Sequence, residues 1–518
     1  MSQKFKPWKD LPQHTGCTSN LEQARDWIRE CDQSDDRCNR YRQFDYLPTR
    51  VIDVSRQEDK IFVTEADGCQ RGRYIALSHC WGNFKPIQTT VVSLPKFRTQ
   101  GINLESLPRT FRDAVLVARF LDCPFLWIDS LCIIQGDRED WAREAPRMAE
   151  VYSNSYLTVA AVSSADCTGG LFYQNDERQV KYEIKRELED GTSMKIYVRP
   201  AIDHSPIDQG LALLPPNPLY PAPLLHRGWF FQEFIFSPRI LFFTNWEILW
   251  QCYQRLTCIC EVRNYRDIAQ KLYLKDKLEY LLPNGSWPDL HWLWSRLISA
   301  YTRRQLTYDS DRLAALSAVT GLMSNTTLGR YISGLWESSL AACLTWSVAY
   351  PGPGTDPPIR RSTDTSVPSW SWASVIGPVR MPLEAYPTLG FEITNFIYDP
   401  GKTHSLVEAS ARAIILRGMV CECRVWCPRY CDHPFYDHTR SIQAVGMENE
   451  CSFTVDVGSE VSCDRAEAML AYVLKVSGDG GIVLFKLDNK EDTYRRIGYI
   501  GSGKVDRMKF TLEVLELV

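Results

Sequence analysis

The first half of the chain repeats a pattern in which a short apolar run is closed by polar residues. Three such runs predict buried β-strands, over residues 74–78, 125–128 and 156–162. Between the first two runs, apolar residues recur at helical spacing from Phe111 to Ala118, which predicts a helix that begins near Ser106 and Pro108. Because strands and helices alternate, the pattern predicts an α/β fold with a parallel sheet, right-handed crossovers and flanking helices.

A second helix is predicted to begin at Asp137, with Trp141, Met148 and Tyr152 on its apolar face. Pro146 falls inside this pattern. A proline lacks the backbone N–H that would bond to the carbonyl four residues earlier, so we expect a kink or an early break there.

The rest of the chain changes character several times. Periodicity is lost and prolines cluster between about residues 174 and 223, a pattern typical of a loop or linker. Helical patterning returns over residues 287–350, and short alternating runs from Phe391 onward predict strands. We therefore expect four parts: a helix and loop leader (1–60), an α/β domain (61–250), a helical region (251–375) and a β-rich C-terminal unit (376–518).

Composition and charge narrow the classes of function. The chain has 518 residues, of which 44% are hydrophobic and 24% charged, as in ordinary globular proteins. A net charge of −4 gives no basic footprint of a nucleic-acid binder. The polar start lacks the apolar core of a secretory signal, and no apolar run is long enough to cross a membrane. These features predict a cytoplasmic protein with no membrane span and no nucleic-acid partner.

Two groups among the 18 cysteines raise the question of a metal site. Cys31 and Cys38 offer two sulfurs with no nearby histidine, short of the four ligands of structural zinc, so ordinary packing is favoured. Four more cysteines lie between Cys421 and Cys431 but lack the usual CxxC spacing. The sequence therefore predicts no metal, and a cytosolic setting predicts reduced thiols.

Polar residues follow the predicted strands. Ligands of open α/β sheets bind beyond the carboxyl ends of the strands. That rule gathers five residues on one rim: Ser78, His79, Asp129, Ser163 and Ser164. A polar rim is also common without any function, and that interpretation is favoured for each residue taken alone.

Glu233 is a carboxylate in a strongly aromatic segment, four residues after Trp229. On a helix this spacing places both side chains on one face. A carboxylate beside aromatic rings can hold ribose hydroxyls or stabilise a developing sugar cation. The alternative is an ion pair of Glu233 with Arg227 or Arg239 at the edge of the core, and spacing alone favours the ion pair.

Several stretches, taken in order, resemble the fungal heterokaryon-incompatibility (HET) domain: YIALSHCWG, LPRTFRDAVLVARFL, FLWIDSLCIIQ, YLTVAAVSS and the closing block RGWFFQEFIFSPRILFF. YISGLWESSLAACLTW and PSWSWAS resemble blocks that often accompany this domain. The resemblance covers about residues 20 to 375. The chain departs from the family by Asp35, near where a histidine often stands between the leader cysteines, by Pro146, and by Phe230 after Trp229.

The resemblance implies a role in self/non-self recognition and programmed cell death after fusion of unlike fungal cells. The HET domain is thought to be distantly similar to the TIR (Toll/interleukin-1 receptor) fold, which implies a TIR/flavodoxin-like core. The Trp229-x-x-x-Glu233 spacing resembles the TIR segment whose glutamate serves NAD cleavage. This carry-over makes Glu233 the candidate catalytic residue, with five candidate substrate-binding residues: Ser78, His79, Trp81, Asp129 and Trp229.

Three hypotheses follow. The first is an incompatibility effector that acts by assembly, as a homo-oligomer or with a partner death-effector protein. The second is an NAD⁺ nucleosidase (NADase) that uses Glu233, takes NAD as its substrate and needs no cofactor. The third is a hydrolase that uses Cys80 or Ser78 as nucleophile, for which the sequence shows no triad.

Overall fold

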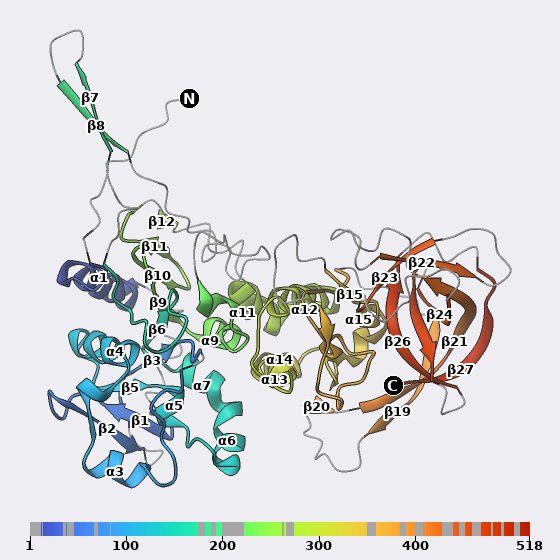
Figure 1. The fold of residues 1–518 in the computed structure, drawn as a ribbon, viewed down its shortest axis with the longest axis horizontal. Helices are drawn as coiled ribbons and strands as arrows, with labels where there is room; N and C mark the ends of the chain where they lie inside the picture. The colour runs from blue at the N-terminus through green and yellow to red at the C-terminus, as the bar shows by residue number, and fades with distance from the viewer. Residues whose placement is uncertain are drawn as a thin grey trace. The chain divides into compact units, whose positions relative to one another are not determined.

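The chain forms two compact units, Met1–Asp276 and Lys277–Val518, each described by itself (Figure 1). The computed structural model describes residues 12, 14–34, 38, 46–66, 71–82, 84–174, 182–187, 193–198, 222–261, 264–265, 274–349, 359–383, 390–398, 408–409, 411–426, 439–444, 451–457, 468–477, 480–487, 492–501 and 508–518. Cys427 and Cys431 of the second cysteine group lie outside these residues.

The first unit is built on a sheet with the strand order β12-β11-β10-β9-β6-β3-β5-β1-β2-β4. Its four central strands run parallel: β3 (Tyr74–Ser78), β5 (Phe125–Trp127), β6 (Leu157–Ala161) and β9 (Arg239–Phe243). The three predicted strands are confirmed as parallel neighbours, since Ile75 of β3 pairs with Leu126 on one side and Leu157 on the other.

The edges of this sheet are antiparallel, so the prediction of a parallel sheet is wrong for the sheet as a whole, which is mixed. One edge holds β1 (Arg50–Asp53), β2 (Lys60–Glu65) and β4 (Ile102–Asn103). The other holds β10 (Ile248–Cys252), β11 (Leu256–Cys258) and β12 (Asn264–Tyr265). The connection from β9 to β10, residues 244–247, is a hairpin turn, and such short turns join only antiparallel strands.

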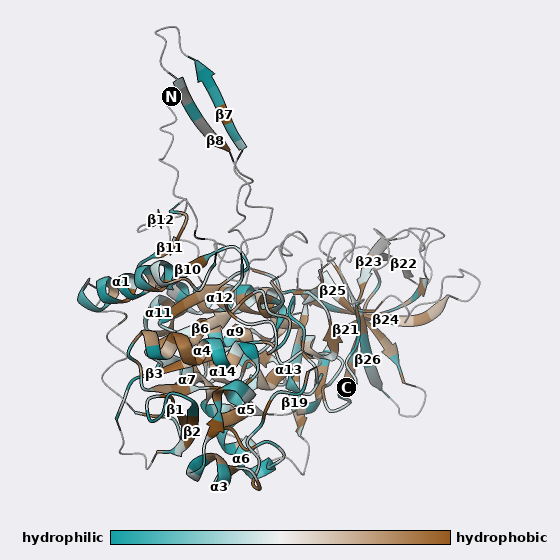
Figure 2. Cartoon of the chain, turned by 60° about the vertical axis from the view of Figure 1, so that its left-hand side comes forward, coloured by the Kyte–Doolittle hydropathy of each residue, from teal (hydrophilic) through white to brown (hydrophobic). Residues whose placement is uncertain are grey.

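Helices cover both faces of the sheet. Figure 1 shows α1 (Thr18–Ser34) and α4 (Arg109–Phe120) on one face and α7 (Met148–Ser153) and α9 (Phe230–Phe236) on the other. The predicted apolar face of α4, from Phe111 to Ala118, is fully buried. Two further short helices are α3 (Leu94–Thr99) and α5 (Asp129–Cys132). A separate pair of strands is formed by β7 (Tyr182–Glu187) and β8 (Ser193–Val198). Figure 2 shows the hydrophobic colour on α4 and largely hydrophilic colour on β7, which is exposed along its length.

The predicted break at Pro146 is confirmed. The Asp137 carboxylate accepts hydrogen bonds from the backbone N–H groups of Glu139 and Asp140, and these bonds begin α6 (Arg138–Glu144). Pro146 then lies in a single 3-10 turn, after which α7 starts at Met148.

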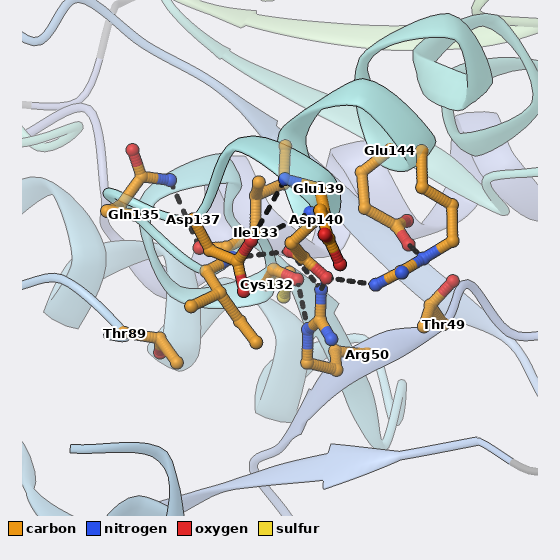
Figure 3. A network of polar contacts seen from close by, with 12 residues as sticks. Thr49, Arg50, Thr89, Cys132, Ile133, Gln135, Asp137, Glu139, Asp140 and Glu144 are labelled. Carbon is orange, nitrogen blue, oxygen red and sulfur yellow. Dashed lines mark hydrogen bonds and ion pairs between the residues drawn. The ribbon is translucent and has the colours of Figure 1, made fainter. Parts of the chain in front are cut away.

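A buried ion pair fixes α6 to the edge of the sheet (Figure 3). Arg50 of β1 donates to both carboxylate oxygens of Asp140, at 2.6 and 2.5 Å, and to the carbonyl of Cys132 at 2.7 Å. The Asp140 carboxylate also accepts from the backbone N–H of Ile134 and from Arg143. The Arg50 and Asp140 side chains are 3% and 1% exposed, so each ion depends on the other for its solvation.

The second unit is helical and then β-rich, as predicted. Its helices are α11 (Leu274–Asn284), which begins in the first unit, α12 (Trp287–Tyr301), α13 (Asp311–Ala314), α14 (Ser317–Met323) and α15 (Leu340–Leu344). Short paired strands accompany them: β13 (Tyr331–Ile332), β14 (Leu335–Trp336), β15 (Ser347–Val348), β16 (Arg360–Arg361), β17 (Val375–Ile376), β18 (Val379–Arg380) and β20 (Glu408–Ala409).

The larger sheet of this unit is organised around one long strand, β21 (Ala411–Trp426). The others are β19 (Phe391–Tyr398), β22 (Thr439–Ala444), β23 (Cys451–Val455), β24 (Met469–Ser477), β25 (Gly480–Lys486), β26 (Thr493–Ile500) and β27 (Thr511–Leu517). Because β21 pairs with both β22 and β24, the ladder from β22 through β23, β26 and β25 to β24 returns to the strand where it began.

The tryptophans of the two downstream blocks pack together in the second unit. Trp346 of the first block donates its ring N–H to the carbonyl of Trp370 in the second block at 2.8 Å. Trp372 donates to the carbonyl of Gly334 at 2.6 Å. All three rings are fully buried. The two blocks thus supply acceptors for the buried N–H groups of Trp346 and Trp372, whereas the N–H of Trp370 has no hydrogen-bond partner among the described residues.

Candidate functional site

Four predicted site residues meet at the carboxyl ends of β3 and β5. Ser78 ends β3 and His79 follows it, while Asp129 opens α5 one residue after Ile128, just beyond β5. Glu233 reaches this edge from α9, where it is 1% exposed. The predicted helical spacing of Trp229 and Glu233 is confirmed, since Trp229 caps the start of α9.

The Glu233 carboxylate is enclosed by two partners. Ser78 donates its hydroxyl hydrogen to Oε2 of Glu233, and Arg227 Nη1 lies 3.6 Å from Oε1. Arg227 also donates to the backbone carbonyl of His79, and its Nη2 lies 3.7 Å from Oδ2 of Asp129. One guanidinium therefore links the two carboxylates, and the ion pair with Arg227 that the sequence left as an alternative is present. The other alternative partner, Arg239, pairs with Asp32 at 2.9 Å.

Ser78, His79, Asp129, Arg227 and Glu233 form one polar cluster. Its outer side is formed by Asp129 together with Trp81. The Trp81 ring N–H donates to Oδ2 of Asp129 at 2.8 Å. Asp129 is 14% exposed and Arg227 22%, whereas Ser78 and Glu233 are sealed from solvent. Gly82, with φ of 61°, leaves no room for a side chain beside Asp166, so the loops after β3 and β6 lie directly against each other.

His79 is buried and electrically neutral. Burial lowers the pKa of its imidazole to about 4, against a weaker opposing effect of Asp129. Its ring lies edge-on to Phe111 at 5.0 Å between centroids. Nδ1 lies 4.0 Å from Asp129, too far for a hydrogen bond, and neither ring nitrogen has a hydrogen-bond partner among the described residues.

Glu233 titrates near neutral pH. Burial raises the pKa of its carboxyl to about 7, and nearby Asp129 adds to that effect, while Arg227 and Ser78 oppose it. A carboxyl with such a pKa exists in both protonation states in the cell, a property shared by many general acids and bases.

The raised pKa predicts a pH dependence of stability. The native state holds the Glu233 proton between pH 4.5 and 7, where the unfolded chain has lost it, so native stability falls as pH rises through this window. The loss is at most about 1.4 kcal/mol per pH unit. The free energies of unfolding of wild type and Glu233→Gln, measured with urea, should differ by an amount that changes between pH 4.5 and 7 and is constant above pH 7. The exposed Glu150→Gln variant should show no such change, and a flat difference for Glu233→Gln across the window would contradict the assignment.

Other sequence candidates lie outside the cluster. Ser163 bonds with Asn245, and Ser164 with Gly170 and Tyr173, in the loops that follow β6 and β9. Trp229 is half-buried against the main core of the first unit. Burial raises the pKa of Cys80 to about 11, the opposite of what a nucleophilic cysteine requires, and Ser78 is occupied by Glu233. These contacts do not favour the hydrolase hypothesis.

Sequence reasoning missed the central position of Arg227. It considered this residue only as a structural partner of Glu233, whereas the guanidinium also contacts the His79 carbonyl and Asp129. The short 3-10 turn η5 (Pro223–His226) delivers Arg227 to the strand ends. An arginine six residues before a carboxylate in a compact aromatic block was the available signal.

Among the helices that the structure describes, none is long and apolar enough to cross a lipid bilayer.

Comparison with known proteins gives one family. Searches of curated proteins and of solved structures give no match. Residues 74–233 match the family model described as "Heterokaryon incompatibility protein (HET)", so the chain carries a HET domain that runs from the first residue of β3 to Glu233.

Proposed function

We propose that this chain is an effector of fungal heterokaryon incompatibility, in which self/non-self recognition leads to cell death, and that its HET domain acts by assembly with further copies or with a partner protein. The matched family supports the first part. The enclosure of Glu233, only 1% exposed behind Ser78 and Arg227, supports the second part, action by assembly. A carboxylate that its neighbours shield from solvent can stabilise the conformation of the domain but is not accessible to a substrate.

The cluster fastens the end of the HET domain to its beginning. Glu233 of α9 holds Ser78 of β3, and Arg227 holds the His79 carbonyl and Asp129. Buried hydrogen bonds to charged groups contribute about 1.5–3 kcal/mol each. The closing block is thus secured to the strand ends, and the domain keeps one defined surface for assembly.

A second candidate function is cleavage of NAD by Glu233. The parallel strands β3, β5, β6 and β9 are the first to fourth parallel strands along the chain. Across the sheet they lie in the order second, first, third, fourth, which is the order of the first four strands of a flavodoxin-like sheet. In that fold ligands bind where the first and third strands diverge, and Ser78 ends the first. A carboxylate there can stabilise a ribose cation as the nicotinamide bond breaks, provided that the cluster opens.

Two variants of Glu233 separate these functions. The Glu233→Gln change keeps the size of the side chain and an acceptor for Ser78, so assembly and killing should persist, whereas catalysis requires the carboxylate. The Glu233→Ala change removes the contact altogether and should abolish assembly and killing. We expect a host that expresses wild type or Glu233→Gln to lose viability while its NAD level stays at that of an empty-vector control.

The readouts are colony formation, cellular NAD and the molar mass of the purified chain by light scattering. Glu150→Gln, which changes an exposed carboxylate on α7, is the matched control and should behave as wild type. A fall in NAD that both Glu233 variants abolish would favour the second candidate. A wild-type chain that leaves viability unchanged would contradict the proposed function.

A further inference from the structure

Three buried cysteines from distant parts of the first unit converge on one point. Cys31 lies near the end of α1, Cys38 follows that helix, and Cys252 ends β10. They are 5%, 1% and 6% exposed. Their three sulfur atoms all lie within 4.8 Å of one another. Sequence reasoning favoured packing for Cys31 and Cys38 because it counted two sulfurs, and the fold adds the third.

The spacing of the sulfurs suits a tetrahedral cation. Zinc binds thiolate sulfur at about 2.3 Å, which places two sulfurs of one tetrahedral site about 3.8 Å apart. Sulfurs that already lie within 4.8 Å reach that separation by small side-chain rotations. Soft thiolate ligands select thiophilic cations such as zinc over magnesium or calcium.

The charge around the sulfurs also favours bound thiolates. Arg239, itself 1% exposed, donates its Nε–H to Sγ of Cys31 at 3.2 Å and is oriented by Asp32 at 2.9 Å. A donor that orients a sulfur ligand from outside is a common feature of metal sites.

We propose that Cys31, Cys38 and Cys252 bind one zinc ion, with a water molecule as fourth ligand. The three sulfurs would release their protons on binding. The ion would connect the leader to the far edge of the sheet, beyond the region matched by the HET family model. This site is independent of the proposed function, because it shares no residue with the cluster around Glu233.

A second buried group in the same unit offers a comparison. Cys258 and Cys260 have sulfurs 3.1 Å apart beside Glu247. The carboxylate of Glu247 accepts the backbone N–H of Cys260 at 2.6 Å, so it already has a structural role in the hairpin. This group supplies only two sulfurs, and we therefore assign the zinc to the three-cysteine group.

The test is the zinc content of the full chain, purified without chelators and measured by inductively coupled plasma mass spectrometry. We expect about one zinc per chain in wild type, at least a tenfold loss in Cys252→Ser, and no change in Cys258→Ser or in Cys123→Ser, a buried thiol outside both groups. Zinc-free wild type, or zinc that survives Cys252→Ser and is lost in Cys258→Ser, would overturn the assignment.

A measurement on the unmodified chain keeps the test valid if a variant does not fold. Alkylation with and without a zinc chelator, read by peptide mass spectrometry, should expose Cys31, Cys38 and Cys252 together on chelation and leave Cys123 protected. Cobalt exchanged into the site should give sulfur-to-metal charge-transfer absorption. Equal labelling with and without chelator, or a disulfide between two of the three cysteines in chain from a reducing host, would refute the proposal.

Discussion

Replacing Asp140 with alanine is expected to lower the free energy of unfolding of the first unit by about 3–5 kcal/mol. The change removes the carboxylate that contacts Arg50 directly and leaves this buried guanidinium, 3% exposed, with only the carboxylate of Glu65 at 3.9 Å. It also removes the acceptor for the Ile134 backbone N–H. An uncompensated buried charge is far more costly than the pair itself is stabilising. The midpoint of urea denaturation, followed by tryptophan fluorescence, measures the loss.

Arg143→Ala is the matched control for this prediction. Arg143 contacts the same carboxylate, but its side chain is 54% exposed, so water replaces the contact and the midpoint should move much less. Equal losses of unfolding free energy for Asp140→Ala and Arg143→Ala would contradict this prediction, because they would show that burial does not determine how much the Arg50–Asp140 pair contributes to stability.

Replacing Arg496 with methionine should destabilise the second unit by a similar amount, about 3–5 kcal/mol. Arg496 is fully buried, and its guanidinium bonds Asp456 at 3.0 and 3.1 Å and lies 3.6 Å over the Trp346 ring. It also donates to the carbonyls of Leu344 and Trp346. Methionine fills most of the volume but leaves these carbonyl acceptors unpaired, and it leaves Asp456 with only the longer contact to Arg361, at 3.6 Å.

A double variant identifies the source of this loss. Adding Asp456→Asn to Arg496→Met removes the buried charge that lost its closest partner and should recover part of the stability, as a double-mutant cycle would show. The exposed pair Lys486–Asp492 of the same unit, 3.4 Å apart, gives the control, and Lys486→Met should have little effect. No recovery in the double variant would indicate that packing against Trp346, and not charge, carries the effect.

The central strands and helices could be predicted because their patterns are local. Residues 74–78 are apolar and end at polar residues, so the strand and its end were both visible. Asp137 and Pro146 have direct backbone consequences, and both occurred as expected. The edge strands could not be predicted in the same way, since β1 is only four residues long and its pairing with β5 joins segments far apart in sequence.

The candidate site was predictable to a similar degree. The rule for strand ends brought Ser78, His79 and Asp129 together. The helical spacing related Glu233 to Trp229 only, and of these two residues Glu233 reaches the strand ends. The position of Arg227 depends on a turn that follows a long irregular segment, and no periodic pattern specifies it. The cysteine group was missed for the same reason, since Cys252 reaches Cys31 only through the folding of the sheet.

The outermost strands of the ten-stranded sheet are very short in the described part of the chain. β4 and β12 comprise two residues each. A strand of that length offers too few free backbone groups to template the addition of another chain. The edges of this sheet are therefore poor sites for strand addition between copies, and growth of a cross-β fibre from them is not expected.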